Sequence, residues 1–415
     1  MIIHFVSHSM TLLNGCLTTS SKSTLWLRGY GLMRVMKLDC PTSLPLKIRI
    51  SDLDVVSYRE YVMSLFKMVD KRSRRELLEK MLKMRGRRKI TRKLKGSNIF
   101  KLKAYILPRD IEVESPEGIA LQALTVSNPA AIINDRNSIL LLPRIGGLNF
   151  SRTLIGYSHV SFGEIQGEMR IRAKVLMMPM LSSESVEDPR VDPDDETHVY
   201  HVRAFDVPTW PCFKRFVFPF SARIAHRGDQ IIAEEIEPIV VIRDDNVVLL
   251  DHFRDTFPLS RNIMLVRPWF DERKIGGVFI GEREENQVKY ESLRPVPELL
   301  PIPGLEVKVG CNVVLRLSRG ERLIIFHSVD HPHGTYHHFA ALADDGGEIM
   351  GITDEPIISP MHQLYCGRRP ATIFVCGAIR AKDKLMLFAG KDNEIIIILE
   401  SEMDEVFERM KFLCG

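Results

Sequence analysis

The chain has 415 residues, which is enough for one large domain with an appendage or for two domains. Hydrophobic residues make up 45% of it and charged residues 27%, the balance of an ordinary soluble globular protein. The formal net charge of +4 is small for this length and excludes a protein that binds polyanions over its whole surface. The seven cysteines include no Cys-x-x-Cys pair, so we expect reduced thiols in a cytoplasmic chain rather than a disulfide framework or a zinc ribbon.

The N-terminal stretch is mildly apolar, but no basic residues precede it and polar residues interrupt it. We therefore expect no secretory signal, and translation from Met33 or Met36 remains an alternative to Met1. No run approaches the roughly eighteen continuous apolar residues that a membrane-spanning helix needs. A membrane is thus not an expected partner.

Residues 51–84 carry apolar side chains at helical spacing, as in YVMSLFKMV and ELLEKMLKM, and predict one or two amphipathic helices. The next segment, RGRRKITRKLKGSNIFKLK at 85–103, is densely basic and is the one place where a nucleic-acid surface could be argued. It lacks the interleaved aromatic residues that stack on single strands, so a solvated basic face is favoured and nucleic acid is not expected as a partner. Residues 1–111 are predicted to form a partly helical, basic N-terminal extension.

After residue 111, short β-branched runs alternate with Gly, Pro, Asn and Asp, which is typical of all-β structure. One pattern recurs: a small or polar residue, a short apolar strand, a charged turn and a second apolar strand. Its copies begin at Asn128, Glu187, Asp255, Gly310 and Ile373, a spacing that suits four-stranded propeller blades. We predict a five-bladed β-propeller over residues 112–400 and a C-terminal helix over 401–415, with a β-sandwich as the alternative.

The innermost strand of each propeller blade starts near the central channel, so polar residues at these starts should converge on one pocket. They are Asn128, Asp188 with Arg190, Arg254 with Asp255, Asn312 and Cys376. One carboxylate among several guanidinium groups suits a polar substrate that meets an anion, because Arg matches phosphate bidentately. Asp188 is then the candidate general acid, and a simple turn residue is its alternative interpretation. If phosphate is the nucleophile, the second carboxylate that glycoside hydrolysis needs becomes unnecessary.

Six segments follow one another along this region. They are Asn128-Pro129-Ala130 with LLLPR ending at Arg144, EDPR at 187–190, RDTFP with MLVRP at 254–268, LIIFHSVD at 323–330, TDEPII at 353–358, and FVCGAI with LFAGKD ending at Asp392. Their order and spacing resemble glycoside hydrolase family 130 over residues 115 to 410. The resemblance implies a five-bladed propeller and an inverting phosphorylase of β-mannosides, although the family also contains some hydrolases.

The resemblance also implies roles for individual residues. It places Asp188 as the general acid, which protonates the glycosidic oxygen, and Arg254, Arg267 and Arg316 as phosphate-binding residues. It places Asn128, Arg144 and Asp392 against the sugar next to the bond that is cleaved. Arg190, at the same strand start as Asp188, is predicted to bind substrate with them. No cofactor is expected beyond inorganic phosphate as a co-substrate.

Five histidines between residues 327 and 338 invite a metal site. Pro332 and the strand-like LIIFHSV argue against a helix that would bring His327 and His331 onto one face, so we expect loop or substrate-contact histidines and no metal. The other three are His333, His337 and His338. Trp210 and Trp269 are expected on loops beside the pocket, where they either stack on a sugar ring or pack between blades.

Three classes of function remain open. The favoured one is a glycoside phosphorylase that uses Asp188 and the Arg cluster. The second is a glycosidase on the same fold, which would need a second carboxylate such as Asp255. The third is a non-catalytic carbohydrate- or nucleic-acid-binding propeller. An oligosaccharide or glycoside is the expected partner, and assembly into a homo-oligomer stays open.

Overall fold

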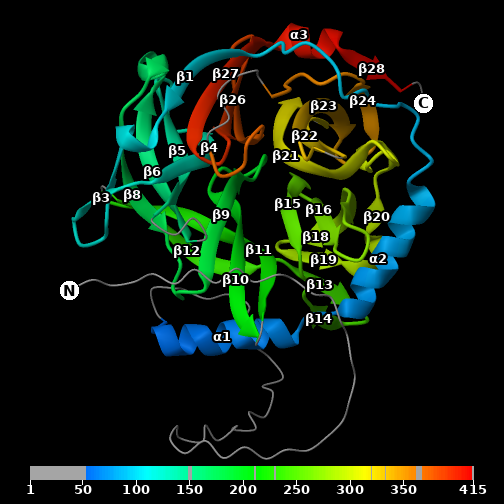
Figure 1. Cartoon of the computed structure of the whole chain (residues 1–415), viewed down its shortest axis with the longest axis horizontal. Helices are drawn as coiled ribbons and strands as arrows, with labels where there is room; N and C mark the ends of the chain where they lie inside the picture. The colour runs from blue at the N-terminus through cyan, green and yellow to red at the C-terminus, as the bar shows by residue number, and fades with distance from the viewer. Residues whose placement is uncertain are drawn as a thin grey trace, which may run out of the picture. The chain divides into compact units, whose positions relative to one another are not determined.

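The structure, a computed structural model of the chain, describes residues 53–147, 152–209, 212–228, 230–318, 320–331, 333–360 and 367–413. These residues form mainly β-strands, and the sheets are arranged around a centre with β4, β9, β15 and β21 innermost (Figure 1). Each of the five predicted hairpins is present as an antiparallel pair of strands. The prediction of an all-β, five-bladed propeller is confirmed.

The first two blades are separate sheets. The first consists of β4 (Thr125–Ile133), β5 (Ser138–Gly146), β6 (Thr153–Ser161) and β8 (Ile171–Met177), extended by β2 (Ile111–Glu114) and β3 (Ala120–Gln122). The second consists of β9 (Glu184–Val191), β10 (His198–Thr209), β11 (Cys212–Arg227) and β12 (Gln230–Pro238). In both, successive strands pair antiparallel from the innermost strand outward.

The third and fourth blades are joined at one edge. The third contains β15 (Phe253–Ser260), β16 (Ile263–Phe270) and β18 (Phe279–Glu284), with β13 (Val240–Arg243), β14 (Asn246–Val248), β19 (Gln287–Lys289) and β20 (Arg294–Pro295) outside them. The fourth contains β21 (Glu306–Ser318), β22 (Glu321–Asp330), β23 (Tyr336–Asp344), β24 (Ile349–Thr353) and β28 (Met410–Phe412). The short β17 (Ile275–Gly276) pairs with both β16 and β21 and so connects the two blades.

The fifth blade is completed by the N-terminal part of the chain. β25 (Ile373–Ala381), β26 (Lys384–Lys391) and β27 (Ile395–Glu402) are followed outward by β1 (Lys101–Ile106), which pairs antiparallel with β27 and parallel with β7 (Gly167–Glu168). A strand before residue 112 therefore belongs to a blade, and it holds the first and last parts of the propeller together. Within 401–415 the chain forms α3 (Met403–Glu408) and then returns to strand in β28.

Apolar side chains fill the spaces between successive blades. One buried cluster joins the fifth and first blades through residues such as Val126, Leu141, Phe388 and Ile398. The inner strands are covered on both faces, as in β4, where only the last residue is exposed. They consequently read as continuous apolar runs rather than as an alternation of apolar and polar residues.

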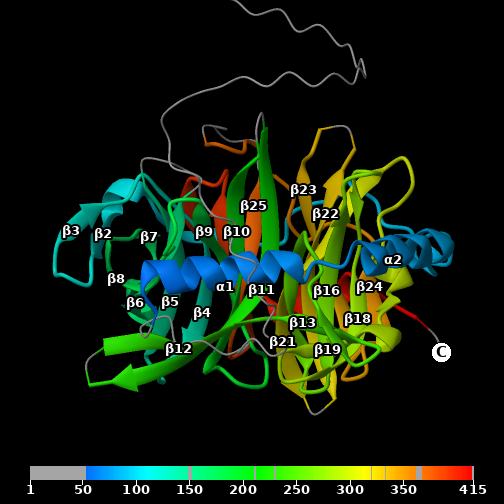
Figure 2. The same cartoon turned by 90° about the horizontal axis from the view of Figure 1, so that it is seen from below.

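The two predicted helices are present as α1 (Val55–Lys67) and α2 (Lys71–Met84) (Figure 2). Asp54 and Asp70 cap them by accepting hydrogen bonds from backbone N–H groups of their first turns. On α1, the Phe66 ring stacks on Phe216 of the second blade at 4.2 Å between centroids. Among the described residues, no helix combines the length and the apolar character needed to cross a membrane.

The basic segment after α2 packs on the propeller. Arg92 is fully buried and pairs with Glu306 at 2.6 Å, while Arg85 and Arg88 each donate to the backbone carbonyl of Pro301. The expectation of a solvated basic face is thus wrong for these three side chains. Their charges contact blade four and the loop before it, because a buried carboxylate and unpaired carbonyl groups are there to receive them.

Candidate active site

The five innermost strands share one irregularity, which lies within each strand rather than at its first residue. In each hairpin the strand pairing shifts register around Asn128, Asp188, Asp255, Asn312 or Cys376, as expected for a β-bulge. Asn128, Asp188 and Asp255 also have left-handed backbone conformations, with φ of 47°, 54° and 48°. Asn and Asp tolerate this conformation better than other side-chain-bearing residues, and such conformations gather at functional sites. The repeated positions found in the sequence are therefore structurally equivalent, although they lie inside the strands and not at the strand starts predicted.

Hydrogen bonds connect these positions from blade to blade. Asn128 Nδ2 donates to Asp188 Oδ1 at 2.8 Å and joins the first blade to the second. Asn312 Nδ2 donates to the Val375 carbonyl oxygen at 2.7 Å and joins the fourth blade to the fifth. The side chains of Asn128 and Asn312 thus link neighbouring blades across the centre.

Arg190 ties three blades together at the centre. Its Nη2 bonds Asp255 Oδ1 at 2.6 Å, its Nε donates to the Asn312 carbonyl oxygen at 2.9 Å, and its Nη1 donates to the Asp188 carbonyl oxygen at 3.1 Å. The residue is only 2% exposed and does not line the cavity described next. The prediction that Arg190 contacts substrate is therefore corrected: its guanidinium group is used to position Asp188 and Asp255.

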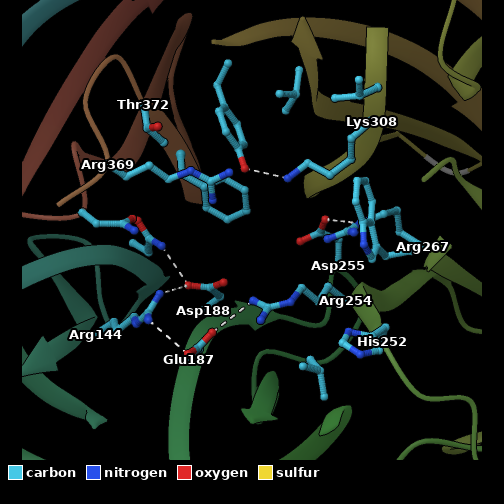
Figure 3. A pocket seen from close by; sticks show the side chains of 18 of the residues that line it. Arg144, Glu187, Asp188, His252, Arg254, Asp255, Arg267, Lys308, Arg369 and Thr372 are labelled. Carbon is cyan, nitrogen blue, oxygen red and sulfur yellow. Dashed lines mark hydrogen bonds and ion pairs between the residues drawn. The ribbon is translucent and has the colours of Figure 1, made fainter. Parts of the chain in front are cut away.

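A cavity of about 520 Å³ opens above these bulges and receives side chains from all five blades (Figure 3). This volume lies within the range of small-molecule sites. Seven of the lining residues are Arg or Lys and four are Asp or Glu, so the cavity is strongly polar with an excess of positive charge. The lining basic residues are Arg144, Arg215, Arg254, Arg267, Lys308, Arg368 and Arg369, and the acidic ones are Glu187, Asp188, Asp255 and Asp271.

The two oxygens of Asp188 have different surroundings. Oδ1 accepts hydrogen bonds from Asn128 Nδ2 at 2.8 Å and from Arg144 Nη1 at 2.9 Å. Within the described ranges Oδ2 has no hydrogen-bond partner, and the carboxyl group faces the cavity (Figure 3). A carboxyl group held through one oxygen keeps the other free to carry and donate a proton.

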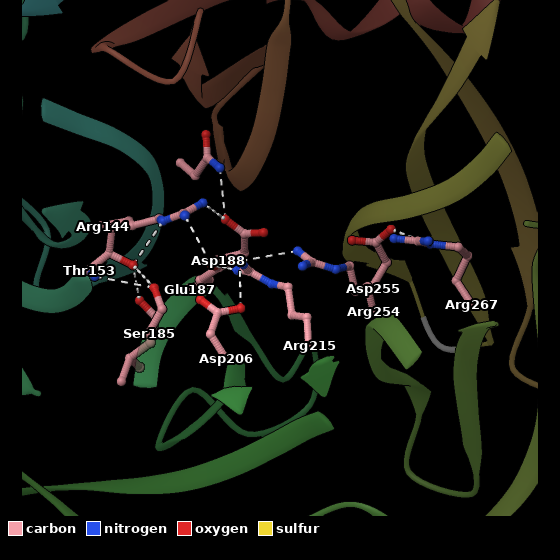
Figure 4. Close-up of polar contacts among 12 residues, drawn as sticks. Arg144, Thr153, Ser185, Glu187, Asp188, Asp206, Arg215, Arg254, Asp255 and Arg267 are labelled. Atoms are coloured by element: carbon pink, nitrogen blue, oxygen red, sulfur yellow. Dashed lines mark hydrogen bonds and ion pairs between the residues drawn. The ribbon is translucent and has the colours of Figure 1, made fainter. Parts of the chain in front are cut away.

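Glu187, which the sequence analysis did not single out, is enclosed by three guanidinium groups (Figure 4). Arg144 and Arg215 contact its Oε1 at 3.2 and 3.0 Å, and Arg254 contacts its Oε2 at 3.1 Å. Burial disfavours its charged form, but the attraction of Arg144, Arg254 and Arg215 outweighs burial and lowers the pKa of Glu187 to about 2. Glu187 is therefore ionised at neutral pH and is committed to holding these Arg side chains.

Both oxygens of Asp255 are also occupied. Arg190 takes Oδ1, and Arg267 Nε donates to Oδ2 at 2.8 Å. Burial raises the pKa of this carboxyl group, but the charges of Arg267 and Arg190 more than offset that effect and hold it well below its usual range. Asp255 is 2% exposed, so it serves as the counter-ion of two buried guanidinium groups.

The opposite side of the cavity carries cations without carboxylate partners. Lys308 Nζ donates to the Tyr336 hydroxyl at 2.6 Å, and the Arg369 guanidinium group lies 4.8 Å from the centre of the Tyr336 ring. In the part of the chain that the structure describes, neither Lys308 nor Arg369 forms an ion pair. Burial, followed by repulsion from Arg267 and Arg369, lowers the pKa of Lys308 well below its usual range. Such a group of unneutralised cations favours an anionic ligand.

Two other predicted site residues lie elsewhere. Arg316 is half exposed and lies 3.7 Å from Asp194, outside the cavity, so the assignment of Arg316 to phosphate is wrong. Asp392 is buried, and its carboxylate accepts from the backbone N–H of Thr372 and from Lys391 Nζ, so it supports the cavity wall instead of lining it. Five of the residues predicted for the site do line the cavity: Asn128, Arg144, Asp188, Arg254 and Arg267.

The histidines and tryptophans are placed differently from the prediction. His327 and His338 lie in the paired strands β22 and β23 and are fully buried, so they are core residues rather than loop residues. No group of three possible metal-ligating side chains occurs in the described ranges. Trp269 does line the cavity, although from strand β16 rather than from a loop. Trp210 lies outside the described residues.

A family described as β-1,4-mannooligosaccharide phosphorylase, glycoside hydrolase family 130, matches residues 90–412. No curated protein sequence matches this chain significantly. Among solved structures, the chain is similar to β-1,2-mannobiose phosphorylase from Listeria innocua, with 14% identity, 69% of this chain and 92% of that one covered, and a TM-score of 0.48. It is also similar to a mannose phosphorylase from Leishmania mexicana in complex with a phosphate ion, with 10% identity, coverage of 74% and 92%, and a TM-score of 0.47. A third similar structure is a putative glycoside hydrolase from Parabacteroides distasonis, with 14% identity, 74% of this chain and 97% of that one covered, and a TM-score of 0.48.

Proposed function

Because the chain belongs to glycoside hydrolase family 130, the β-1,4-mannooligosaccharide phosphorylase family, we propose that it cleaves β-mannosides with inorganic phosphate and releases a sugar 1-phosphate. The observation that carries the proposal is the division of the cavity into two sides. On one side Asp188 presents a single free carboxyl oxygen, and on the other Lys308 and Arg369 carry charges that no described carboxylate neutralises. A sugar held by the first side would meet an anion held by the second.

Asp188 is the proposed general acid. Its proton passes to the glycosidic oxygen as the bond from that oxygen to the anomeric carbon breaks. Asn128 and Arg144 hold Oδ1 and thereby keep Oδ2 pointed at the substrate, and both side chains also lie where they can contact the sugar. Such positioning contributes to the rate, because the acid is already oriented toward the glycosidic oxygen and loses little conformational entropy in the transition state.

Phosphate is the proposed nucleophile. One of its oxygens forms the new bond to the anomeric carbon from the face opposite the leaving group, so the configuration inverts and a β-mannoside gives the α-anomer of the sugar 1-phosphate. Arg254, Arg267, Lys308 and Arg369 are the proposed phosphate ligands, since their charges surround one end of the cavity (Figure 3). Charge neutralisation by these side chains needs no metal ion or organic cofactor.

The contacts of the acidic residues argue against the hydrolase alternative. An inverting hydrolase needs a second carboxylate that accepts a proton from water. Both oxygens of Asp255 are bound by Arg190 and Arg267, and Glu187 is bound by three Arg side chains. A carboxylate with so low a proton affinity is a poor base, so neither residue is suited to activate water.

The proposal extends to the setting of the reaction. Cys212, Cys311 and Cys376 are free thiols, in keeping with a cytoplasmic protein, where phosphate is also plentiful. Three basic residues of the 85–103 segment, Arg85, Arg88 and Arg92, are bound to the propeller, so fewer of its charges are available to a nucleic acid. An oligosaccharide or glycoside is the proposed partner.

The test is incubation with a panel of β-linked mannosides, with and without phosphate, followed by separation of the products. We expect a sugar 1-phosphate to form with at least one member of the panel, at a rate that rises with phosphate concentration. Cleavage to free sugars at the same rate in phosphate-free buffer would support the hydrolase instead. Binding without cleavage in either buffer would support the non-catalytic propeller.

A further inference from the structure

Helix α2 lies outside the family match, which begins at residue 90, yet it contacts the rim of the cavity. Its apolar face is anchored in the core of the third blade, where Leu77 and Met81 are almost fully buried. On its polar face Glu76 accepts a hydrogen bond from the Tyr290 hydroxyl at 2.7 Å, and Lys80 Nζ donates to the Leu293 carbonyl oxygen at 3.1 Å. The helix is therefore fixed to the blade along its whole length.

Arg74 extends from this helix to two residues that line the cavity. Its Nη2 donates to the Trp269 carbonyl oxygen at 2.9 Å and to Asp271 Oδ2 at 3.0 Å. The other oxygen of Asp271, Oδ1, accepts the indole N–H of Trp269 at 2.8 Å. Arg74, Asp271 and Trp269 thus form a closed set of contacts, in which the carboxylate lies between the guanidinium group and the indole ring.

We propose that Arg74 is a positioning residue, which through Asp271 holds the Trp269 indole as a platform for a sugar ring of the substrate. This inference rests on the proposed action on mannosides. Trp presents a flat apolar surface to the C–H face of a sugar ring, and its indole N–H needs a partner when the ring is held still. Trp269 is the tryptophan within the described residues that lines the cavity.

Asp271 needs Arg74 to perform this task. The side chain of Asp271 is 56% exposed, whereas that of Arg74 is 15% exposed. An exposed carboxylate is readily solvated and would otherwise sample several orientations, because the hydrogen bond from the indole and the longer contact with His252 Nε2 at 3.8 Å would not fix it. The half-buried guanidinium group, attached to an anchored helix, supplies a further contact from a fixed direction. The residue that orients the platform thus comes from a segment outside the matched region.

The kinetic test compares Arg74→Ala with Arg74→Lys and with Arg75→Ala. Arg75 is the matched control, because it lies on the same helix, is exposed and makes no hydrogen bond or ion pair among the described residues. For Arg74→Ala we expect the KM for the mannoside to rise about two- to tenfold, the range that an aromatic contact is worth. The KM for phosphate and the melting temperature should stay close to those of Arg75→Ala. The lysine variant, which retains one donor, should recover part of the loss.

A second readout does not depend on turnover. In a Trp26→Phe, Trp210→Phe background, fluorescence reports Trp269 alone, since the chain has three tryptophans. We expect Arg74→Ala to increase quenching by acrylamide, and a mannoside added without phosphate to protect Trp269 less than in the Arg74 parent. Unchanged quenching and protection would overturn the inference. If the parent protein binds mannosides and protects Trp269 but yields no sugar 1-phosphate, the proposed function fails while the role of Arg74 stands.

Discussion

The two sides of the cavity use the same kind of side chain for opposite purposes. Around Glu187 and Asp255, every Arg is matched to a carboxylate: Arg144, Arg215 and Arg254 surround the first, and Arg190 and Arg267 hold the second. Around Tyr336, Lys308 and Arg369 have no such match among the described residues. The Arg side chains around Glu187 and Asp255 are therefore neutralised by the protein itself, whereas Lys308 and Arg369 are not.

This difference distinguishes charged side chains that stabilise the fold from charged side chains that are available to bind a ligand. A buried ion pair with both partners present is satisfied, and removing one partner leaves the other unpaired in a poorly solvated place. Burial, and after it repulsion from Arg267 and Arg369, lowers the pKa of Lys308, and an anion bound beside Lys308 would offset both effects. Changes to Arg190, whose contacts all lie within the protein, should therefore alter stability, and changes to Lys308 and Arg369 should alter phosphate affinity. Arg254 and Arg267 belong to both groups, because each pairs with a carboxylate and also lines the cavity. Asp188 combines the two situations, because its Oδ1 accepts hydrogen bonds from Asn128 and Arg144 while its Oδ2 has no partner among the described residues.

The largest expected effect concerns Asp188. Asp188→Asn keeps the size and shape of the side chain and should preserve the contact with Arg144 through the amide oxygen, so folding should be retained. It removes the proton that the leaving oxygen needs, and we expect kcat on an unactivated mannoside to fall by about a hundred- to ten-thousandfold. Kinetics together with a thermal melt check this. Near-native turnover by a folded variant would remove Asp188 from the mechanism.

Arg190→Ala tests the paired side through stability. The substitution removes one of the two partners of buried Asp255 and the bond to the Asn312 carbonyl oxygen, so the free energy of unfolding should fall by about 3–5 kcal/mol. Chemical denaturation of the variant and the parent measures the difference. A loss below about 1 kcal/mol, the usual value of an exposed ion pair, would show that the centre of the propeller does not depend on this charge.

Lys308→Met and Arg369→Ala test the unpaired side through affinity. Each charge-assisted hydrogen bond to phosphate is worth roughly 1.5 to 3 kcal/mol, so each variant should raise the KM for phosphate about ten- to a hundredfold. The KM for the mannoside and the melting temperature should change little. An equal rise in both KM values would place these residues at the sugar rather than at phosphate.

The smallest expected effect is that of Arg316→Ala, which serves as the control for Lys308→Met. Both residues lie on β21, but the Arg316 side chain is 53% exposed and contacts Asp194 at the far end of the strand. Removing an exposed pair costs at most about 1 kcal/mol and should leave both KM values unchanged. A selective rise in the KM for phosphate would restore the prediction made from the sequence.

The repeated pattern was sufficient to predict the propeller and its five hairpins, because each hairpin carries its own turn and apolar signals. The inner strands begin earlier than predicted, since the polar residues taken as strand starts lie at bulges inside the strands. It did not predict which way Arg190 faces, since the bulge around Asp188 interrupts the alternation of side chains on which such an inference depends. The sequence prediction put Arg316 in the pocket, but only the first part of β21 reaches the cavity, where Lys308 lies. A strand rises about 3.3 Å per residue, so Arg316 lies roughly 25 Å further along β21. Lys308 and Arg369 lie outside the recurring hairpin positions and could be recognised only once the blades were assembled.

The most direct test of the central claim, that phosphate and not water receives the sugar, is cleavage of a β-linked mannobiose in phosphate buffer made with oxygen-18 water. Phosphorolysis incorporates a phosphate oxygen, and hydrolysis incorporates an oxygen from the labelled water. We predict one α-sugar 1-phosphate and one free mannose for each bond cleaved, with no oxygen-18 at the anomeric oxygen of the sugar 1-phosphate, which does not exchange with water. Release of two free mannose molecules for each bond cleaved, at a rate independent of phosphate concentration and without sugar 1-phosphate, would contradict the account.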